Sequence, residues 1–315
     1  MPPLAKSSLS IVLGISLFTM PPSRADDDLM QLSLEELLSV QVTSVSKKSQ
    51  SLFEAAAAIH VITREDIQRS GMTSIPELLR LVPGMHVARI GSNKWAISSR
   101  GFSDRRANKL LVLMDGRTLY TPLYSGVYWD VQDTPLDDIE RIEVILGPGS
   151  TLWGANAVNG VINIITRNSN DTQGGLVVAR AGDEEKGVTL RYGGTLGKHT
   201  ALRAYVKFRE QDRFTLPDGN QSYDAWDNRQ AGFRADWEPS GRDTFTLQGD
   251  IYSGNHEDEI FAAYDLNSAI TRTRSSADNS GGNLLLRWKQ TRSGDSEWEF
   301  QVYYDYAERN DAILG

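Results

Sequence analysis

The chain has 315 residues, a formal net charge of −8 at pH 7 and no cysteine. The lack of thiols excludes disulfides, thiolate zinc sites and cysteine nucleophiles, and the acidic balance gives no reason to expect a nucleic-acid partner. The length allows more than one domain with a core of its own.

Residues 1–25 have the pattern of a secretory signal peptide. Lys6 precedes an apolar run, Leu9 to Met20, and Ser23-Arg24-Ala25 places small residues at the two positions that a signal peptidase reads. The run is too short to span a bilayer as a helix. Cleavage would remove two bases and no acid, and so change the formal charge from −8 to −10. We therefore expect export with cleavage; an uncleaved apolar anchor is the alternative.

Residues 52–168 have the pattern of a compact α/β domain. A strand at 59–63 leads into a short helix at 64–71, which Gly71 ends. Ser74 can cap a second helix, which ends at Pro83-Gly84. Four further candidate strands follow between Gly, Asn and Asp turns, with the sequences MHVARI, AISSRGF, KLLVLMDG and RIEVIL.

The stretch from Ile139 to Arg167, IERIEVILGPGSTLWGANAVNGVINIITR, has strand-like ends and a glycine-rich middle. Such a middle can cradle a phosphate, because bare backbone N–H groups approach an anion closely. Gly147 and Gly149 lack the third glycine of a dinucleotide fingerprint, and no Gly-Lys-Ser/Thr follows. A nucleotide site is therefore not expected, and we interpret these glycines as turn residues.

From Gly175 onward the pattern changes to a two-residue alternation. In residues 201–209, ALRAYVKFR, apolar side chains alternate with polar ones. A soluble sandwich of sheets gives the same alternation. The candidate strands lie at 176–182, 188–196, 200–210, 228–238, 244–254, 282–291 and 296–308.

Three details favour membrane-barrel strands over a soluble sandwich. Strands of about ten residues suit tilted spans of a bilayer. The connections near 197–199, 239–243 and 292–295 are short, whereas those near 211–227 and 255–281 are long and polar, as expected when the short ones face the periplasm. Aromatic residues near the strand ends could form interfacial girdles: Trp237, Tyr252, Trp288, Trp298, Tyr304 and Tyr306.

Both regions resemble one family, the TonB-dependent outer-membrane receptors of Gram-negative bacteria. The resemblance is carried by ITREDI, ISSRGF, LLVLMDGR and IERIEVILGPGSTLWGANAVNGVINIIT, in this order. It implies an α/β plug domain followed by antiparallel transmembrane β-barrel strands, in a barrel of about 22 strands. We expect a signal peptide at 1–25, a leader at 26–51, the plug at 52–168 and a partial barrel at 169–315. Seven strands are fewer than such a barrel needs, so we expect an N-terminal part of a receptor.

The resemblance also implies TonB, with its inner-membrane energising complex, as a partner. In this family a short segment before the plug, the TonB box, pairs with TonB as an added strand, which requires an extended and unpaired segment on a flexible leader. QVTSVS fits, because valine and threonine favour an extended chain. The candidate box is Gln41, Val42, Thr43, Ser44, Val45 and Ser46, and an ordinary linker strand is the alternative.

Arg100 and Arg141 match plug positions that, in this family, meet a pair of barrel glutamates. Bidentate guanidinium pairs would anchor the plug and still exchange with water. An ion pair within the plug, to Glu143 or Asp115, is the alternative that the sequence leaves open.

The outward loops of the plug are where the resemblance places the ligand. An aromatic, lightly basic lining suits a ferric siderophore, and also a cobalamin. The candidate residues are Asn93, Lys94, Trp95, Tyr120, Tyr124, Tyr128 and Trp129. Glu257, Asp258 and Glu259 are weak candidates for a cation site; solvated loop charge is the favoured interpretation, and no cofactor is expected.

Two other classes of protein remain as alternatives. A secreted β-rich hydrolase is disfavoured, because His60, His86, His199 and His256 form no zinc-type pair and no Gly-x-Ser-x-Gly elbow occurs. A soluble periplasmic binding module would share the plug but would not be embedded in outer-membrane lipid. We expect a receptor of the outer membrane and not an enzyme.

Overall fold

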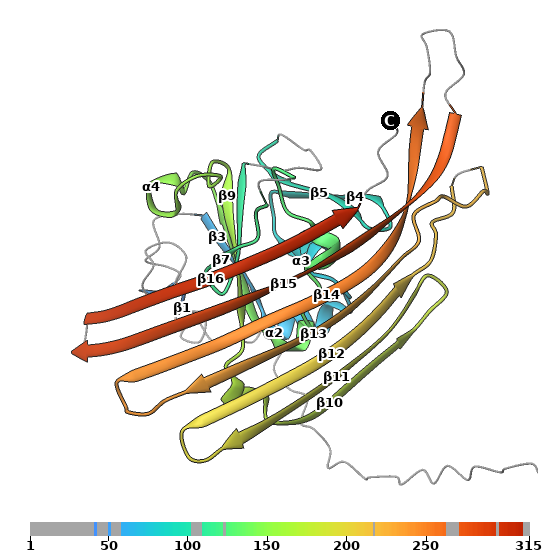
Figure 1. The fold of residues 1–315 in the computed structure, drawn as a ribbon. Helices are drawn as coiled ribbons and strands as arrows, with labels where there is room; N and C mark the ends of the chain where they lie inside the picture. Colours follow the sequence, from blue (N-terminus) through green and yellow to red (C-terminus); the bar gives the residue numbers. More distant parts are fainter. Residues whose placement is uncertain are drawn as a thin grey trace, which may run out of the picture. The chain divides into compact units, whose positions relative to one another are not determined.

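The computed structural model describes residues 41–42, 50–51, 58–101, 109–121, 124–216, 218–262, 271–293 and 296–310. From Gln41 to Gly315 the chain forms one compact unit. Its two main parts are an N-terminal domain, from β3 to η6, and a seven-stranded antiparallel sheet, from β10 to β16 (Figure 1). Among the helices in the described ranges, none is both long and apolar enough to cross a membrane.

The N-terminal domain is built on a five-stranded sheet in the order β3-β8-β9-β6-β7. Its strands are β3 (Ala58–Thr63), β6 (Leu110–Met114), β7 (Arg117–Thr118), β8 (Ile139–Leu146) and β9 (Gly160–Thr166). β6 and β9 are parallel, and the other neighbours are antiparallel. A separate hairpin joins β4 (Met85–Gly91) to β5 (Lys94–Ser99).

Short helices connect the strands of this domain. They are α2 (Arg64–Ser70), α3 (Ile75–Leu78), α4 (Ser150–Trp153), η3 (Leu79–Leu81), η4 (Trp129–Val131), η5 (Leu136–Asp138) and η6 (Ser169–Thr172). The core is made mainly of branched aliphatic side chains with zero exposed area, including Ile62, Ile97, Ile142, Ile162 and Ile164. The domain therefore buries apolar side chains in the way that a protein in water does.

Local sequence explains the first strand–helix junction. The Thr63 hydroxyl accepts the Asp66 N–H at 3.2 Å, and the Asp66 carboxylate accepts the Thr63 N–H at 2.8 Å, which completes a capping box. Gly71, with φ of 67°, ends α2 as expected. Ser74 precedes α3 as predicted but makes no side-chain capping hydrogen bond, so that expectation was wrong.

The glycine-rich stretch from Ile139 to Arg167 forms β8, a turn, α4 and β9. Gly160 begins β9 where the strand crowds its neighbour, because a Cβ there would lie 2.5 Å from the Ile145 carbonyl oxygen. The glycines of this stretch therefore serve close packing and turns, as the sequence suggested.

The larger sheet contains β10 (Gly174–Ala181), β11 (Glu185–Leu196), β12 (Thr200–Gln211), β13 (Trp226–Trp237), β14 (Asp243–Ala262), β15 (Thr271–Ser293) and β16 (Ser296–Asn310). Each strand pairs with its neighbours in chain order, so that β10 and β16 are the edges of the sheet within the described residues (Figure 1).

One predicted loop is largely strand. The connection at 255–281 was expected to be a long polar loop, but β14 and β15 stay paired as far as Ala262 and Thr271. The apolar alternation that defined strands in the sequence stops near residue 254, whereas backbone pairing needs only N–H and C=O groups and continues beyond it.

Candidate functional site

The seven-stranded sheet buries its polar face and exposes its apolar face. On β12, Leu202, Val206 and Phe208 are 38%, 37% and 47% exposed. The alternating cations Arg203, Lys207 and Arg209 are only 6%, 4% and 8% exposed. This is the reverse of the pattern in the N-terminal domain, and it shows that the polar face carries the contacts within the molecule.

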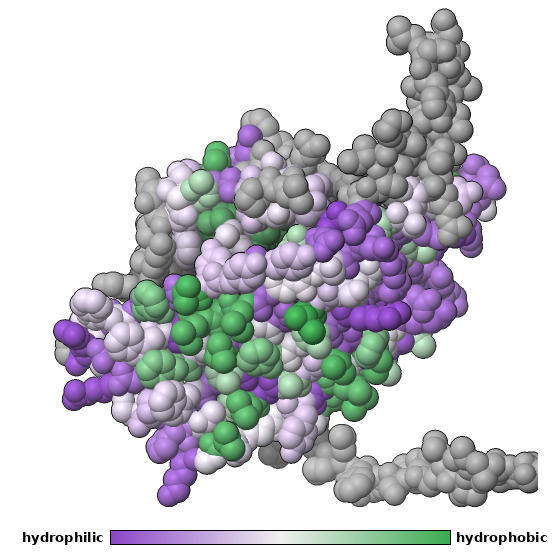
Figure 2. All heavy atoms as spheres, viewed as in Figure 1, coloured by the Kyte–Doolittle hydropathy of each residue, from purple (hydrophilic) through white to green (hydrophobic). Residues whose placement is uncertain are grey.

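The register places the exposed apolar side chains of neighbouring strands on one face. Val206 lies opposite Leu190 and Ala231, and Leu286 lies opposite Leu247 and Val302, so apolar side chains share one face. Figure 2 shows apolar side chains gathered over the middle of these strands and hydrophilic ones towards their ends. Near the short turns this face ends in a row of stacked rings, with centroids 5.1 Å apart for Trp237 and Phe245 and 6.1 Å apart for Phe245 and Trp288.

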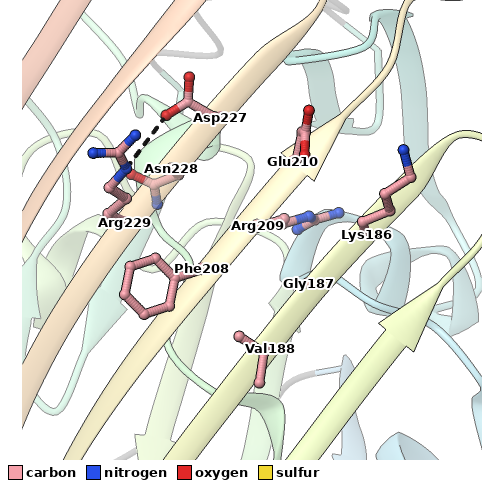
Figure 3. A pocket seen from close by; sticks show the side chains of 9 residues that line it. All are labelled: Lys186, Gly187, Val188, Phe208, Arg209, Glu210, Asp227, Asn228 and Arg229. Carbon is pink, nitrogen blue, oxygen red and sulfur yellow. Dashed lines mark ion pairs between the residues drawn. The ribbon is translucent and has the colours of Figure 1, made fainter. Parts of the chain in front are cut away.

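At the opposite end of β11, β12 and β13 the exposed face becomes charged. A hollow there has Val188 and Phe208 on its apolar side (Figure 3). Lys186, Glu210, Asp227 and Arg229 make up its charged side, with 3.9 Å between the Arg229 and Asp227 side chains. The exposed apolar band is thus bounded by aromatic rings at one end and by charges at the other.

On the buried face, carboxylates of the N-terminal domain meet cations of the sheet. Asp138 lies 2.6 Å from Arg191 and 3.6 Å from Arg203. Asp133 lies 2.7 Å from Lys207 and 3.2 Å from Arg209. Ion pairs, most of them also charge-assisted hydrogen bonds, thus link the domain to the sheet.

Asp115 makes a second group of contacts with the sheet. It occupies an Asp-Gly turn between β6 and β7, where Asp115 and Gly116 have φ of 49° and 79°, as a two-residue hairpin requires. Its carboxylate accepts hydrogen bonds from Gln248 at 2.8 Å and from the Thr166 hydroxyl at 2.7 Å. Burial by itself raises the pKa of Asp115, but Arg234 at 4.0 Å and these hydrogen bonds lower it below its usual range.

A cavity of ≈ 530 Å³ lies between the N-terminal domain and strands β13 to β16. Its wall includes Tyr120 and Tyr128 from the domain and Tyr252 and Tyr303 from the sheet. Asp305 also lines it, paired with Arg117. Phenol rings, carboxylates and a guanidinium can together bind a bulky ligand by stacking and hydrogen bonding.

The N-terminal domain matches a known family. Residues 51–161 match the TonB-dependent Receptor Plug Domain. Residues 51–161 thus belong to the plug-domain family of TonB-dependent receptors. The recognition made from the sequence is confirmed, and the N-terminal domain is the plug; we call the seven-stranded sheet the wall.

The similarity to two curated relatives extends over more than half of the chain. The vitamin B12 transporter BtuB of Vibrio vulnificus is 31% identical over 180 residues, which is 56% of this chain and 29% of the relative. The iron-regulated outer membrane virulence protein of Vibrio cholerae serotype O1 is 31% identical over 230 residues, 67% of this chain and 32% of the relative. The chain thus spans about a third of the length of these relatives. The first is named as a transporter and the second as an outer membrane protein. With the plug-domain match, this confirms the expectation of a protein that is not an enzyme.

Solved structures show the same fold. The ferripyoverdine receptor of the outer membrane of Pseudomonas aeruginosa aligns with a TM-score of 0.68 at 16% identity, over 88% of this chain and 38% of the receptor. The siderophore receptor PiuA of Acinetobacter baumannii aligns with a TM-score of 0.64 at 16% identity, over 89% of this chain and 40% of that receptor. A plug followed by antiparallel strands of an incomplete barrel, the predicted fold class, is confirmed.

The structure separates the seven ligand candidates into two groups. Tyr120 and Tyr128 line the cavity, and Tyr124 stacks on Tyr128 with centroids 4.3 Å apart. Trp95 and Trp129 are 6% and 7% exposed and pack in the core of the plug. This corrects the expectation that both tryptophans present a surface to a ligand. A large aromatic ring stabilises the fold most where most of its surface is buried.

Asn93 and Lys94 lie on the β4–β5 turn, which docks on the wall. The Asp224 carboxylate accepts the Ser92 N–H at 2.9 Å, and Trp226 Nε1 donates to the Ser92 carbonyl at 3.1 Å. The Asn93 side chain is 4% exposed, and neither of its amide atoms has a hydrogen-bond partner. A buried amide without partners is costly, so Asn93 remains a candidate for hydrogen bonding to a ligand.

Arg100 and Arg141 both contact the plug. Arg141 Nε lies 2.7 Å from the buried Glu143 carboxylate, the alternative that the sequence had left open. Arg100, in a left-handed conformation with φ of 57°, donates to the Leu146 carbonyl at 3.1 Å. Anchoring to barrel glutamates stays a prediction for both arginines.

The candidate TonB box is partly described. Gln41 and Val42 form β1, which is extended as expected but pairs with β2, Gln50–Ser51. The expectation of an unpaired strand is therefore wrong for these two residues. Thr43, Ser44, Val45 and Ser46 lie outside the described residues.

The weak cation candidates do not form a metal site in the described part of the chain. Glu257 is bound by Arg213 through two contacts of 2.8 and 2.9 Å. The side chains of Asp258 and Glu259 lie outside the described residues. Among the side chains that are described, no group of three or more His, Asp or Glu could hold a metal ion.

Sequence reasoning missed Asp133, Asp138 and Asp224. Asp133 and Asp138 flank the short segment TPLD, residues 134–137, and Asp224 lies in the β12–β13 connection. One signal was present: once the apolar side of β12 is assigned to lipid, its cations must face the plug, and buried cations require carboxylate partners.

Proposed function

We propose that this chain is the plug and the first wall strands of an outer-membrane receptor that takes up a bulky ligand with energy supplied through TonB. The observation that carries the proposal is the inverted wall, apolar outside and ion-paired to a plug inside. A transporter of this design must remain in lipid and still let its plug rearrange, and polar contacts exchange with water more readily than an apolar core does.

The exposed apolar band supports the outer membrane over a soluble periplasmic module. Soluble monomers rarely expose contiguous apolar patches of more than a few hundred Å². Here the apolar side chains of successive strands form one continuous face that aromatic rings bound at one end. That arrangement suits the hydrocarbon of a bilayer and an aromatic girdle at its boundary.

A ferric siderophore is the proposed ligand, and cobalamin is the second candidate. The tyrosine-rich cavity suits a bulky aromatic chelate. The names of the relatives support both classes, because one is iron-regulated and the other is a vitamin B12 transporter. Asn93, Lys94, Tyr120, Tyr124 and Tyr128 are the proposed contacts.

Single-cysteine labelling tests the orientation in the membrane. The chain has no native cysteine, so each variant carries one thiol. With an impermeant thiol reagent on intact cells, Asn220→Cys should be labelled, whereas His199→Cys and Ser240→Cys in the short turns should react only after the outer membrane is permeabilised. Labelling of the short-turn pair in intact cells would reverse the orientation. Recovery of the protein in the soluble periplasmic fraction would favour the binding module.

Uptake assays test coupling and ligand class together. In a receptor of full family length that carries this sequence, labelled ferric siderophore and labelled cyanocobalamin should be compared in cells with and without TonB. Val45→Pro should abolish TonB-dependent uptake and leave binding to outer membranes unchanged, because proline removes a backbone donor from the pairing strand. Val45→Ile is the control, since it keeps both the donor and the β propensity. Unchanged uptake in the proline variant would place the box elsewhere in residues 26–51.

A further inference from the structure

The inner face of β11 and β12 carries a row of cations that runs along the wall. Arg203, Lys207 and Arg209 alternate along β12, and Arg191 of β11 is directly opposite Tyr205. At about 3.3 Å per residue, the six steps from Arg203 to Arg209 cover about 20 Å. We call these four residues the cation track.

Two carboxylates of the plug occupy this track. Asp138, with no exposed area, contacts Arg191 and Arg203, while Asp133, 5% exposed, contacts Lys207 and Arg209. Each carboxylate therefore pairs with two cations. Its two oxygens lie where two oxygens of a larger anionic ligand could bind.

The pairing leaves hydrogen-bonding capacity unused. Arg191 Nε and Arg209 Nε are buried and have no acceptor, and one oxygen of Asp133 and one of Asp138 has no donor. Among the described residues, the other acid that contacts the track is Glu185, 3.1 Å from Arg209. Four cations thus contact three carboxylates, and withdrawal of the plug would leave Glu185 as the carboxylate in direct contact with them.

We propose that the cation track is an anion-binding site of the wall, and that Asp133 and Asp138 hold the places of a ligand's oxyanion groups while the plug is seated. The chemical class that it would take is an anionic ligand with carboxylate, catecholate or phosphate oxygens, because guanidinium groups bind such oxygens in pairs. The link to transport rests on the proposed function and selects an anionic ferric complex over a neutral ligand. The capacity to bind an anion does not depend on it.

Removal of one plug carboxylate tests the site directly. Asp133→Asn keeps the shape of the side chain but leaves Lys207 and Arg209 without that charge. In the complete chain refolded in detergent micelles, we expect this variant to bind about one equivalent of radiolabelled inorganic phosphate, roughly tenfold more tightly than the wild type, the change that 1.4 kcal/mol produces. Sodium chloride at the same ionic strength should not compete.

Two controls separate a built site from charge alone. Asp171→Asn removes one negative charge from an exposed position of η6 and should leave phosphate binding as in the wild type. Asp133→Asn combined with Lys207→Met should lose the gained binding, because one of the two uncovered cations is gone and the pair is broken. Equal phosphate binding by all the variants would overturn the proposal.

A variant of the second plug carboxylate keeps the test decisive if Asp133→Asn does not fold. Asp138→Asn uncovers Arg191 and Arg203 and should show the same gain. If both variants lose their fold in chloride and recover it in phosphate, the anion has replaced the carboxylate and the proposal is supported. If neither folds in phosphate, the track requires the carboxylates themselves and the proposal is wrong. Uptake is not measured in any of these experiments, so a failure of the transport proposal would leave their results unaffected.

Discussion

The plug and the wall use the same kinds of residue in opposite ways. In the plug, Ile142 and Ile162 have no exposed area. In the wall, Ile251 and Phe300 are 67% and 61% exposed, while Asp236 and Gln211 are 1% and 2% exposed. The difference teaches that the two parts bury opposite kinds of side chain: the plug encloses apolar side chains, whereas the wall turns its polar face to the plug and its apolar face outward.

The contacts between the two parts follow from this difference. A wall whose inner face is polar cannot hold the plug by apolar burial, so ion pairs and hydrogen bonds take that role. Buried ion pairs contribute little net stability, because desolvation offsets much of their attraction. A plug held in this way is fixed in position without being fused to the wall, as the proposed function requires.

The largest effect should come from the plug core. Ile162→Ala removes a fully buried side chain of β9 and should destabilise the plug by about 2–5 kcal/mol. Val206→Ala on the exposed face of the wall should stay within about 0.5 kcal/mol in micelles. Urea unfolding of the refolded chain measures both variants, and similar losses would contradict the difference between the two parts.

The next effect should depend on the solvent. Val206→Arg places a charge near the middle of the apolar band and should cost about 2–4 kcal/mol in lipid vesicles. Glu210→Arg, in the charged region beyond the band, should cost about 0–1 kcal/mol near the interface. If Val206→Arg is neutral in vesicles, the exposed face does not meet hydrocarbon, and a soluble sandwich becomes the better description.

A smaller effect should come from one glycine of the plug. Gly160→Ala brings a Cβ to 2.5 Å from the Ile145 carbonyl oxygen, and overpacking of this kind costs about 1–3 kcal/mol. Gly175→Ala in β10 is the matched control, because nothing lies within 4 Å of its Cβ. Thermal unfolding of the two variants should therefore differ; equal midpoints would show that the crowded strand can shift.

The smallest effect should be a pH dependence of the plug. Burial lowers the pKa of the half-buried His60 below its usual value, against a smaller opposing effect of Asp66. The unfolded chain then takes up a proton at a higher pH than the folded chain does, so plug stability should fall as the pH drops below about 6.5. His60→Gln should remove this slope in urea unfolding at a series of pH values. If the slope is unchanged in this variant, another titratable group causes the pH dependence.

Much of the fold could be predicted from local chemistry. The capping box of Thr63 and Asp66, the Asp115-Gly116 hairpin turn and the alternation along β12 are all properties of a few neighbouring residues. The site was predicted less well. Tyr120 and Tyr128 do line a cavity, but Trp95 and Trp129 belong to the core, because an aromatic residue in a loop sequence carries no sign of whether its ring points inward.

By itself, the sequence determined the order of the elements, the turns between them and the membership of a family, since these depend on residues close together in the chain. Only the tertiary structure decided which face of the wall is buried, because a two-residue alternation is unchanged when its two faces are exchanged. It also decided that Asp133 and Asp138 pair with Lys207 and Arg203, residues more than sixty positions away along the chain. Contacts between such distant residues leave no local pattern, and they form only when the packing of the plug on the wall brings opposite charges together.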